Sequence, residues 1–248
     1  MALCAARRVP LLPAPGERVA IFLLGAIGYM IESSFFFAGL ARGSAAAVTL
    51  IFYTYPALVT IAAAVRLRRP PSRVVVAALC LSFAGSATIV AAGGDVELTR
   101  LGVFFAVCSS LSFALYLVAG DGLVRLSDPM TTGAWVAIGA SVSFLGRALV
   151  TGFDSVGGQW PVLIGNGVAN AVAFGAMFAA LRRLGPSRTA VVLTLEAVFA
   201  VTLAAVVLDE PLSPVQTVGA VAVLAAAVIV ARAKATEAVV ASADAVHP

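Results

Sequence analysis

The sequence predicts an all-α polytopic membrane protein in which about eight transmembrane helices form an inverted-repeat helical bundle. Of its 248 residues, 61% are apolar and only 11% are charged. Soluble domains are usually about a quarter charged and less than half apolar. One crossing of a hydrocarbon core about 30 Å thick takes about 20 apolar residues. Eight crossings would therefore occupy roughly two thirds of the chain, close to the apolar fraction found.

Eight apolar stretches alternate with short connections rich in Gly, Pro and charged residues. Because the connections are short, consecutive helices are expected to be antiparallel neighbours. Ser72 and Ser213 are expected to cap the third and the last helix, and Pro214 suits the first position of the last one. The predicted spans are Arg18–Leu40, Ser44–Arg66, Arg73–Gly93, Arg100–Val124, Thr131–Thr151, Gln159–Leu181, Pro186–Leu208 and Ser213–Arg232.

The basic residues lie mainly in alternate connections. Thirteen of the sixteen fall on the side that holds both termini, whereas the connections with Asp95, Asp154 and Asp209 lie on the other side. Loops rich in Arg and Lys stay in the cytoplasm, so both termini are expected to be cytoplasmic, in the plasma (inner) membrane. The N-terminal segment has no long apolar core and is not a signal peptide. The tail beyond Lys234 is expected to be frayed.

The remaining composition argues against several classes of function. The sparse, scattered charges do not form a surface for nucleic acid. Cys4, Cys80 and Cys108 lack the spacing of metal ligands, and the only histidine, His247, lies in the tail. We therefore expect no cofactor and no metal, with the lipid bilayer and a small-molecule solute as partners. An intramembrane enzyme is disfavoured because it would need a Ser/His pair, an HExxH helix or two aspartates inside the bilayer.

The first three spans align with the last three without a gap when the chain is compared with itself in the register that places Pro70 on Pro211. Residues 70–74 (Pro-Pro-Ser-Arg-Val) then fall on residues 211–215 (Pro-Leu-Ser-Pro-Val) and share Pro-x-Ser-x-Val. The repeated spans are five crossings apart, so the two copies must have opposite orientations. Inverted repeats are typical of alternating-access transporters, in which the substrate site lies near the midplane between the copies.

At these residues the chain resembles the EamA-type family of the drug/metabolite transporter superfamily. The family pattern reads Leu-Glu-Pro-Val, an apolar run, Gly-Glu-x-Leu-Ser and a later Gly. Residues 195–198 (Leu-Glu-Ala-Val), residues 209–213 (Asp-Glu-Pro-Leu-Ser) and Gly219 match it, with two substitutions. In the first copy Pro56 is kept, but Arg69 stands where the family has an acidic residue.

The resemblance implies ten helices in two inverted units of five. It covers roughly Arg18 to Lys234, so the first copy lacks the first two helices of the family. Either the start of the sequence is misassigned, or the sequence is a fragment, or the protein has eight helices. A truncated or degenerate member that does not transport alone is the alternative function. The implied organisation is a cytoplasmic segment (1–17), an incomplete first repeat (18–93), a second repeat of five helices (98–234) and a cytoplasmic tail (235–248).

Two carboxylic acids, Glu32 and Glu196, are predicted near the middle of spans. An acidic residue at the membrane centre costs roughly 2.5 to 3.5 kcal/mol, so it faces the bundle interior or a wet cavity. Such a carboxyl could carry a proton or bind a cationic substrate. It could equally be a hydrogen-bonded structural group, and this alternative stays open. Glu196 matches the glutamate of the family pattern.

Further polar residues recur at helical spacing. Asn166 and Asn170 share one helix face, Thr49 and Tyr53 lie on a stripe that also holds Pro56, and Tyr116 ends a stripe that begins with serines. These side chains could orient a polar substrate or hydrogen-bond a neighbouring helix.

Pro56 removes a backbone donor, so it is expected to kink its helix, which suits gating or close packing. Ala78, Ser82 and Ser86 form a face of small residues in the third span. Small residues allow close approach of helices, so this face predicts packing within the chain or contact in a homodimer.

Overall fold

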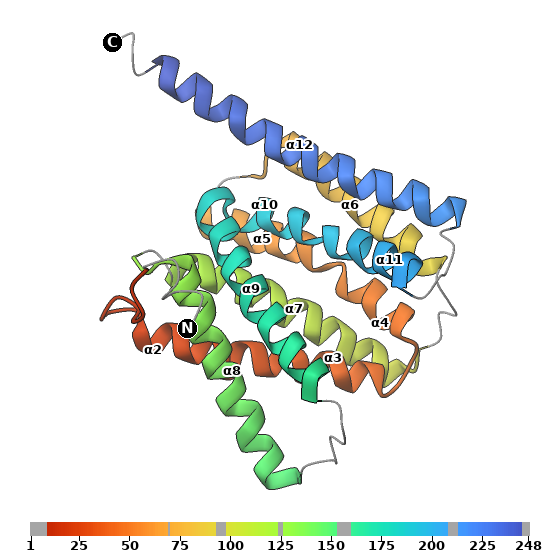
Figure 1. The fold of residues 1–248 in the computed structure, drawn as a ribbon. Helices are drawn as coiled ribbons and strands as arrows, with labels where there is room; N and C mark the ends of the chain where they lie inside the picture. The colour runs from red at the N-terminus through yellow and green to blue at the C-terminus, as the bar shows by residue number, and fades with distance from the viewer. Residues whose placement is uncertain are drawn as a thin grey trace. The chain divides into compact units, whose positions relative to one another are not determined.

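The computed structural model describes residues 9–68, 70–92, 98–123, 126–152, 160–207 and 213–244. No strand occurs in these ranges, and the ribbon in Figure 1 is built of helices, which confirms the all-α class. Seven described helical segments are long and apolar enough to cross a membrane. The eighth predicted span consists of two shorter helices, α10 (Pro186–Leu193) and α11 (Leu195–Val207). About eight membrane-spanning segments are therefore present, as predicted.

The chain divides into two compact units, and each contains parts of both predicted repeats. Unit 1 comprises Met1–Ser34 and Leu115–Gly185, and unit 2 comprises Phe35–Ala114 and Pro186–Pro248. The boundaries fall within α3 (Met30–Leu40) and α7 (Arg100–Leu123), so each unit holds part of both helices. Unit 1 also contains α2 (Arg18–Leu23), the π-helix η1 (Leu24–Tyr29), α8 (Pro129–Thr151) and α9 (Trp160–Leu184). Unit 2 also contains α10 and α11 with α4 (Ala45–Phe52), α5 (Tyr55–Leu67), α6 (Arg73–Ala91) and α12 (Pro214–Asp244).

In unit 1, α8 packs against α2 and η1 through glycines. A Cβ on Gly25 would collide with the backbone of Val136, and a Cβ on Gly139 would collide with the carbonyl oxygen of Phe22. In a π turn the backbone hydrogen bonds join residues five apart instead of four, so the pairing of the carbonyl oxygens with helix amides changes. The Ser143 hydroxyl donates to the Ala26 carbonyl oxygen at 2.6 Å. This π turn was not predicted from the sequence. The hydrogen bond from the Ser143 hydroxyl of α8 stabilises it.

The segment before α2 is fastened to the start of α8 by a buried carboxylate. The two Glu17 oxygens accept hydrogen bonds from the backbone amides of Leu126 and Ser127, each at 2.8 Å, and only 7% of Glu17 is exposed. The Ser127 hydroxyl accepts from the Ala14 amide at 2.9 Å, and its carbonyl accepts from Arg182 at 3.1 Å. One residue of the α7–α8 connection thus joins the N-terminal segment to the end of α9.

In unit 2, α6 and α12 pack along one another (Figure 1). An added Cβ on Gly85 would lie 2.7 Å from the Gly219 carbonyl oxygen, and one on Gly219 would lie 2.7 Å from the Gly85 carbonyl oxygen. Ala78 and Ala226 lie together in a buried cluster. As numbers rise in α6 they fall in α12, so these two helices are antiparallel.

The contact between α6 and α12 relates equivalent positions of the predicted repeat. The register that places Pro70 on Pro211 also places Ala78 on Gly219 and Gly85 on Ala226. The pair Gly85–Gly219 therefore maps onto the pair Ala78–Ala226 when the copies are exchanged, as in an isologous interface. Equivalent helices of the two copies meet antiparallel, as an inverted repeat requires. The small face of α6, including Ser82 and Ser86 at 0% exposure, is used for packing within the chain.

The predicted helix caps are present. The Ser72 hydroxyl accepts from the Val75 amide at 3.4 Å. Ser213 and Gln216 exchange two hydrogen bonds at the start of α12, of 3.0 and 3.2 Å, and Pro214 is its first residue. This reciprocal pair is a capping box.

The predicted span Ser44–Arg66 is present as the apolar segment Ala45–Arg66. This segment and the predicted span Pro186–Leu208 were each expected to be a single helix, but each consists of two, with interruptions at Tyr53–Thr54 and at Thr194. The tail beyond Lys234 was predicted to be frayed, but α12 continues to Asp244, because its Ala-rich sequence favours a helix. The connections with Asp95, Asp154 and Asp209 lie outside the described residues, as does Arg69.

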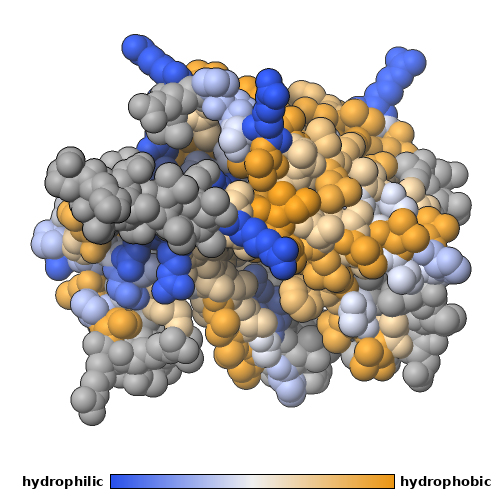
Figure 2. Space-filling model, turned by 90° about the horizontal axis from the view of Figure 1, so that it is seen from above, coloured by the Kyte–Doolittle hydropathy of each residue, from blue (hydrophilic) through white to orange (hydrophobic). Residues whose placement is uncertain are grey.

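The described surface carries many large apolar side chains, and the face seen in Figure 2 is largely apolar. Helices from both units contribute side chains that are more than half exposed, including Val19, Val65, Leu149, Ile164 and Val218. Soluble monomers rarely expose so many apolar groups together. Contact with lipid accounts for these surfaces.

Replacing Gly85 or Gly219 by Ala is expected to lower the thermal unfolding temperature of the detergent-purified protein. Each added methyl group overpacks the close contact between α6 and α12, at a cost of about 1–3 kcal/mol. The double variant should lower the unfolding temperature by less than the sum of the two single effects, because both methyl groups overpack the same contact. The matched control is Gly146→Ala in α8, where a Cβ meets nothing within 4 Å. Equal losses at Gly146 and Gly85 would contradict this account of the interface.

Glu17→Ala should also destabilise the protein, because it leaves two backbone amides without their acceptors. Unsatisfied buried donors cost about 1–3 kcal/mol each. Glu17→Gln keeps one acceptor oxygen and should give an intermediate unfolding temperature. An alanine variant as stable as the wild type would show that the carboxylate does not fasten this segment.

Candidate functional site

Two carboxylic acids and four tyrosines form the main polar groups within the described spans. Tyr29, Tyr53, Tyr55 and Tyr116 are all the tyrosines of the chain. Glu196 belongs to unit 2 together with Tyr53 and Tyr55. Glu32 belongs to unit 1 together with Tyr29 and Tyr116. Each unit thus holds one of these two carboxyls and two of the tyrosines.

The unit 2 group is built at the break between α4 and α5. Pro56 has no N–H to offer the Phe52 carbonyl four residues earlier. The Ser110 hydroxyl of α7 donates to this Phe52 oxygen at 3.1 Å and lies 2.9 Å from the Thr54 hydroxyl. Thr54 in turn donates to the Ile51 carbonyl at 2.7 Å. The helix is interrupted just before Pro56, where a kink was predicted, and hydroxyl groups donate to the carbonyls of Phe52 and Ile51.

The second break lies between α10 and α11 at Thr194. The Thr194 hydroxyl donates to the Val191 carbonyl at 2.6 Å, as Thr54 does three residues back in the first copy. A threonine hydroxyl that bonds a preceding carbonyl competes with regular helical pairing. No proline marks this position, since Ala197 stands where the family pattern has one, so the sequence analysis did not predict this break.

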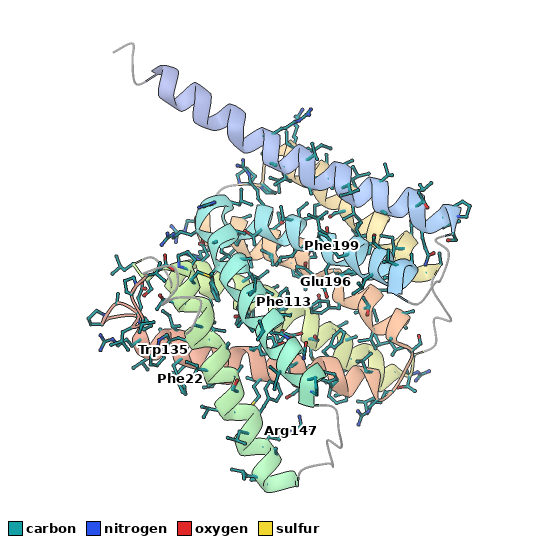
Figure 3. All side chains as sticks on the ribbon, viewed as in Figure 1. Phe22, Phe113, Trp135, Arg147, Glu196 and Phe199 are labelled. Carbon is teal, nitrogen blue, oxygen red and sulfur yellow. The ribbon has the colours of Figure 1, made fainter. Side chains whose placement is uncertain are left out.

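Glu196 lies in the first turn of α11, directly after the break (Figure 3). The first turn of a helix carries unpaired N–H groups and partial positive charge, which stabilise a carboxylate. Its side chain is exposed, whereas Tyr53 and Tyr55 are 4% and 1% exposed. The Tyr55 hydroxyl donates to the Ala190 carbonyl of α10 at 3.3 Å. That bond ties the start of α5 to α10, the helix that precedes Glu196.

Aromatic rings surround this break. Tyr55 meets Phe113 of α7 edge to face, with ring centroids 4.8 Å apart, and Phe52 lies 5.1 Å from Tyr55 and 5.3 Å from Phe113. Phe36 adds a further edge contact to Phe52 at 5.4 Å. Aromatic pairs at these separations contribute about 0.5–1.5 kcal/mol each beyond the area they bury. These ring contacts hold Tyr55 in place. The predicted residue Thr49 is half-buried and lies one helical turn before Tyr53.

The unit 1 group is more enclosed. Glu32 in α3 is 7% exposed, and the Ser33 hydroxyl donates to its Oε2 at 3.2 Å. Tyr116 is 3% exposed and lies 6.4 Å from Phe178, between ring centroids. Tyr29, which the sequence analysis did not select, meets Phe174 edge to face at 5.0 Å. Tyr29 precedes Glu32 by three residues, a helical spacing that could have identified it.

Asn166 and Asn170 share one face of α9, as their spacing predicts. The Asn170 amide donates to both the Asn166 side-chain oxygen and its backbone carbonyl, each at 2.9 Å. Asn166 is exposed and Asn170 is half-buried. Their mutual bonds use part of their hydrogen-bonding capacity within one helix.

The predicted site residues therefore separate into two sets. Glu196, Tyr53, Thr49 and Pro56 belong to unit 2, whereas Glu32, Tyr116, Asn166 and Asn170 belong to unit 1. Ser110 and Phe113 were not selected from the sequence, although the proline four residues after Phe52 indicates an unpaired carbonyl that needs a donor. Among the described residues, no three His, Cys, Asp or Glu side chains gather as a metal site would require.

Comparisons with known proteins agree with this architecture. A comparison with curated protein sequences gives no match. One solved structure, titled "Crystal structure of protein", superposes with a TM-score of 0.75 at 20% identity, covering 93% of this chain and 82% of that chain. This is a likeness of fold. The profile of the EamA-like transporter family matches residues 1–91 and 100–232. Since these segments make up most of the sequence, the chain belongs to the EamA-like transporter family.

Proposed function

We propose that this protein is a secondary-active transporter that moves a small metabolite or drug-like solute by alternating access, with Glu196 as a proton-coupling group. Membership of the EamA-like family identifies it as a membrane transporter of small solutes. It also argues against an enzyme, because the family is one of transporters. The alternating-access mechanism and the coupling to protons are what we propose beyond family membership.

The antiparallel packing of equivalent helices supports alternating access. In transporters with inverted repeats, the copies exchange conformations to open the site to one side and then the other. The reciprocal contact of α6 and α12 gives this chain such a pair. Breaks near the middle of equivalent spans, at Tyr53–Thr54 and Thr194, expose helix ends where an ion or solute can bind.

The position of Glu196 is the observation that carries the proposal. It is an exposed carboxyl near the middle of the segment Pro186–Val207, at the start of α11. Contact of such a group with lipid would cost roughly 2.5 to 3.5 kcal/mol, so water or a solute is expected to reach it. A carboxyl group in contact with water can take up and release a proton.

Glu32 is proposed as a second, supporting acidic group. It is almost fully buried and bonded by Ser33, so it has less access to water than Glu196. Tyr53, Tyr116, Thr49 and the two asparagines are proposed to orient the solute, with Pro56 and its break as the gating element. These roles rest on position and chemistry.

The chain is a multi-pass membrane protein, and we propose the plasma membrane as its location, with both termini in the cytoplasm. The support is the placement of thirteen of sixteen basic residues in connections on one side. A homodimer is also proposed. It would use a surface other than the small-residue face of α6, which α12 already covers.

Glu196→Gln is expected to abolish proton-coupled flux. The full chain would be reconstituted in liposomes that contain a trapped pH-sensitive dye, under an imposed pH gradient, with a panel of amines, amino acids and sugars. Solute-dependent proton movement in the wild type should fall at least 100-fold in this variant, because an amide cannot carry the proton. Glu32→Gln should retain a measurable rate.

Two results would contradict the proposal. Unchanged proton flux in Glu196→Gln would remove Glu196 from the coupling. Absence of solute-dependent flux in the folded wild type across the panel would favour the alternative, a truncated or degenerate member that does not transport alone.

A further inference from the structure

We propose that one end of unit 2 binds the headgroup of an anionic phospholipid through arginines from three helices. Arg73 starts α6, Arg188 lies in the first turn of α10, and Arg232 lies in α12. The inference does not depend on the proposed transport, because it concerns the contact of this unit with the membrane. It follows from the register of the three helices, from the level of the arginines in the membrane and from the apolar side chains beside them.

The packing of α6 against α12 brings Arg73 and Arg232 to one level. The two helices are antiparallel, and Ala78 and Ala226 lie in the same buried cluster. Six residues before Ala78 is Ser72, the cap of α6, and six residues after Ala226 is Arg232. In antiparallel helices these two steps run in the same direction and cover about 9 Å each. Arg232 therefore lies level with the start of α6, where Arg73 is.

The third arginine comes to the same end from α10. Val191 of α10 lies in one buried cluster with Ala78 of α6 and Val230 of α12. Arg188 precedes Val191 by three residues, so it shares a helix face with Val191 and lies about 4.5 Å further along the axis. The segment formed by α10 and α11 leads to the start of α12, so α10 begins at the opposite end, where Arg232 is. Three packed helices thus carry arginines at one end of unit 2.

These arginines lie at the level of lipid headgroups. Arg73 is the first residue of one apolar span, and Arg232 is the last residue but one of another. Both are exposed, and Arg188 is half-buried. Arg66 and Arg68 lie at the end of α5, a short connection before α6, and are also exposed. We call these five residues the arginine end of unit 2.

Exposed apolar side chains lie on the same helices, on the membrane side of the arginine end. Val74 and Val76 of α6 are each 42% exposed, and Val228 and Ile229 of α12 are 48% and 38% exposed. A phospholipid places its phosphate on the arginines and its acyl chains against these side chains. A soluble anion uses the arginines alone. The combination therefore favours a lipid as the ligand.

The sign of the charge selects the lipid. A guanidinium group holds a phosphate through two parallel hydrogen bonds, and basic residues between the ends of membrane helices recognise anionic headgroups. A zwitterionic headgroup carries the same phosphate together with a cation, which the arginines repel. Orientation in the membrane requires only that basic residues lie in the connections on one side. It does not require arginines of α6, α10 and α12 to converge, and this convergence indicates a binding site.

The test is native mass spectrometry of the full chain in detergent, with equal amounts of phosphatidylglycerol and phosphatidylcholine that have the same acyl chains. We expect bound phosphatidylglycerol to exceed bound phosphatidylcholine at least tenfold. Arg73→Gln, Arg188→Gln and Arg232→Gln should each lower this ratio about twofold to fivefold, the upper value corresponding to about 1 kcal/mol per arginine. The triple variant should bind both lipids about equally.

Arg100→Gln is the matched control. It removes an exposed arginine that also starts a span, α7, at the other end of unit 2. The lipid ratio of this variant should stay close to that of the wild type. A wild-type ratio near one would overturn the proposal, and so would a loss in Arg100→Gln as large as that in Arg232→Gln.

Two further measurements separate the proposal from misfolding and from binding of a soluble anion. Arg232→Lys keeps the charge and should retain more of the lipid preference than Arg232→Gln, with both variants unfolding at the wild-type temperature. Equal losses in these two variants would contradict recognition by charge. Glycerol phosphate in large excess should leave phosphatidylglycerol bound. Its displacement would show a site for soluble phosphates and would contradict the lipid site.

Discussion

The pairing of backbone groups in hydrocarbon is the constraint on which the rest of this structure depends. A backbone amide or carbonyl left unpaired there costs several kcal/mol, so spans are helices, and any break needs a substitute partner. The described departures from α-helical pairing are met by hydroxyl groups. The Ser110 hydroxyl donates to the carbonyl left without a donor by Pro56, the Thr194 hydroxyl donates to the Val191 carbonyl just before the second break, and the Ser143 hydroxyl donates to a carbonyl of the π turn. Hydroxyl groups thus bond carbonyls beside the helix ends at both breaks, one of which directly precedes Glu196.

The second organising feature is the close contact of α6 and α12. Hydrophobic burial does not drive helix association in lipid, so van der Waals packing of small residues must do more of this work. Gly85 and Gly219 supply that packing, and the register of the repeat carries their contact onto Ala78 and Ala226. A change on one side of the interface is therefore expected to affect both copies. The repeat proposed from the sequence thus corresponds to a packing arrangement in the structure.

Much of the fold could be predicted from the sequence because hydrophobic length and helix capping are local properties. The span starts at Arg18, Arg73 and Arg100 agree with the structure, as does the cap at Ser213. The break at Thr194 and the π turn could not be predicted, because both depend on hydrogen bonds that the local residue pattern does not determine. For the candidate site, Glu32 and Glu196 could be selected from the sequence because charge in an apolar run is conspicuous. Tyr29 and Tyr55 were not selected, because the rings and hydrogen bonds around them follow from packing.

The repeat also relates Glu196 to a residue of the first copy. The same register places Tyr55 on Glu196, so equivalent positions of the two copies hold a phenol and a carboxyl group. Two carboxylates close together would disfavour each other's charged form. A phenol in one copy avoids this repulsion. Its hydroxyl donates to the Ala190 carbonyl, and its ring packs edge to face against Phe113. The two copies therefore differ at this position: Glu196 is exposed, whereas Tyr55 is held by its hydrogen bond to Ala190 and by the ring of Phe113.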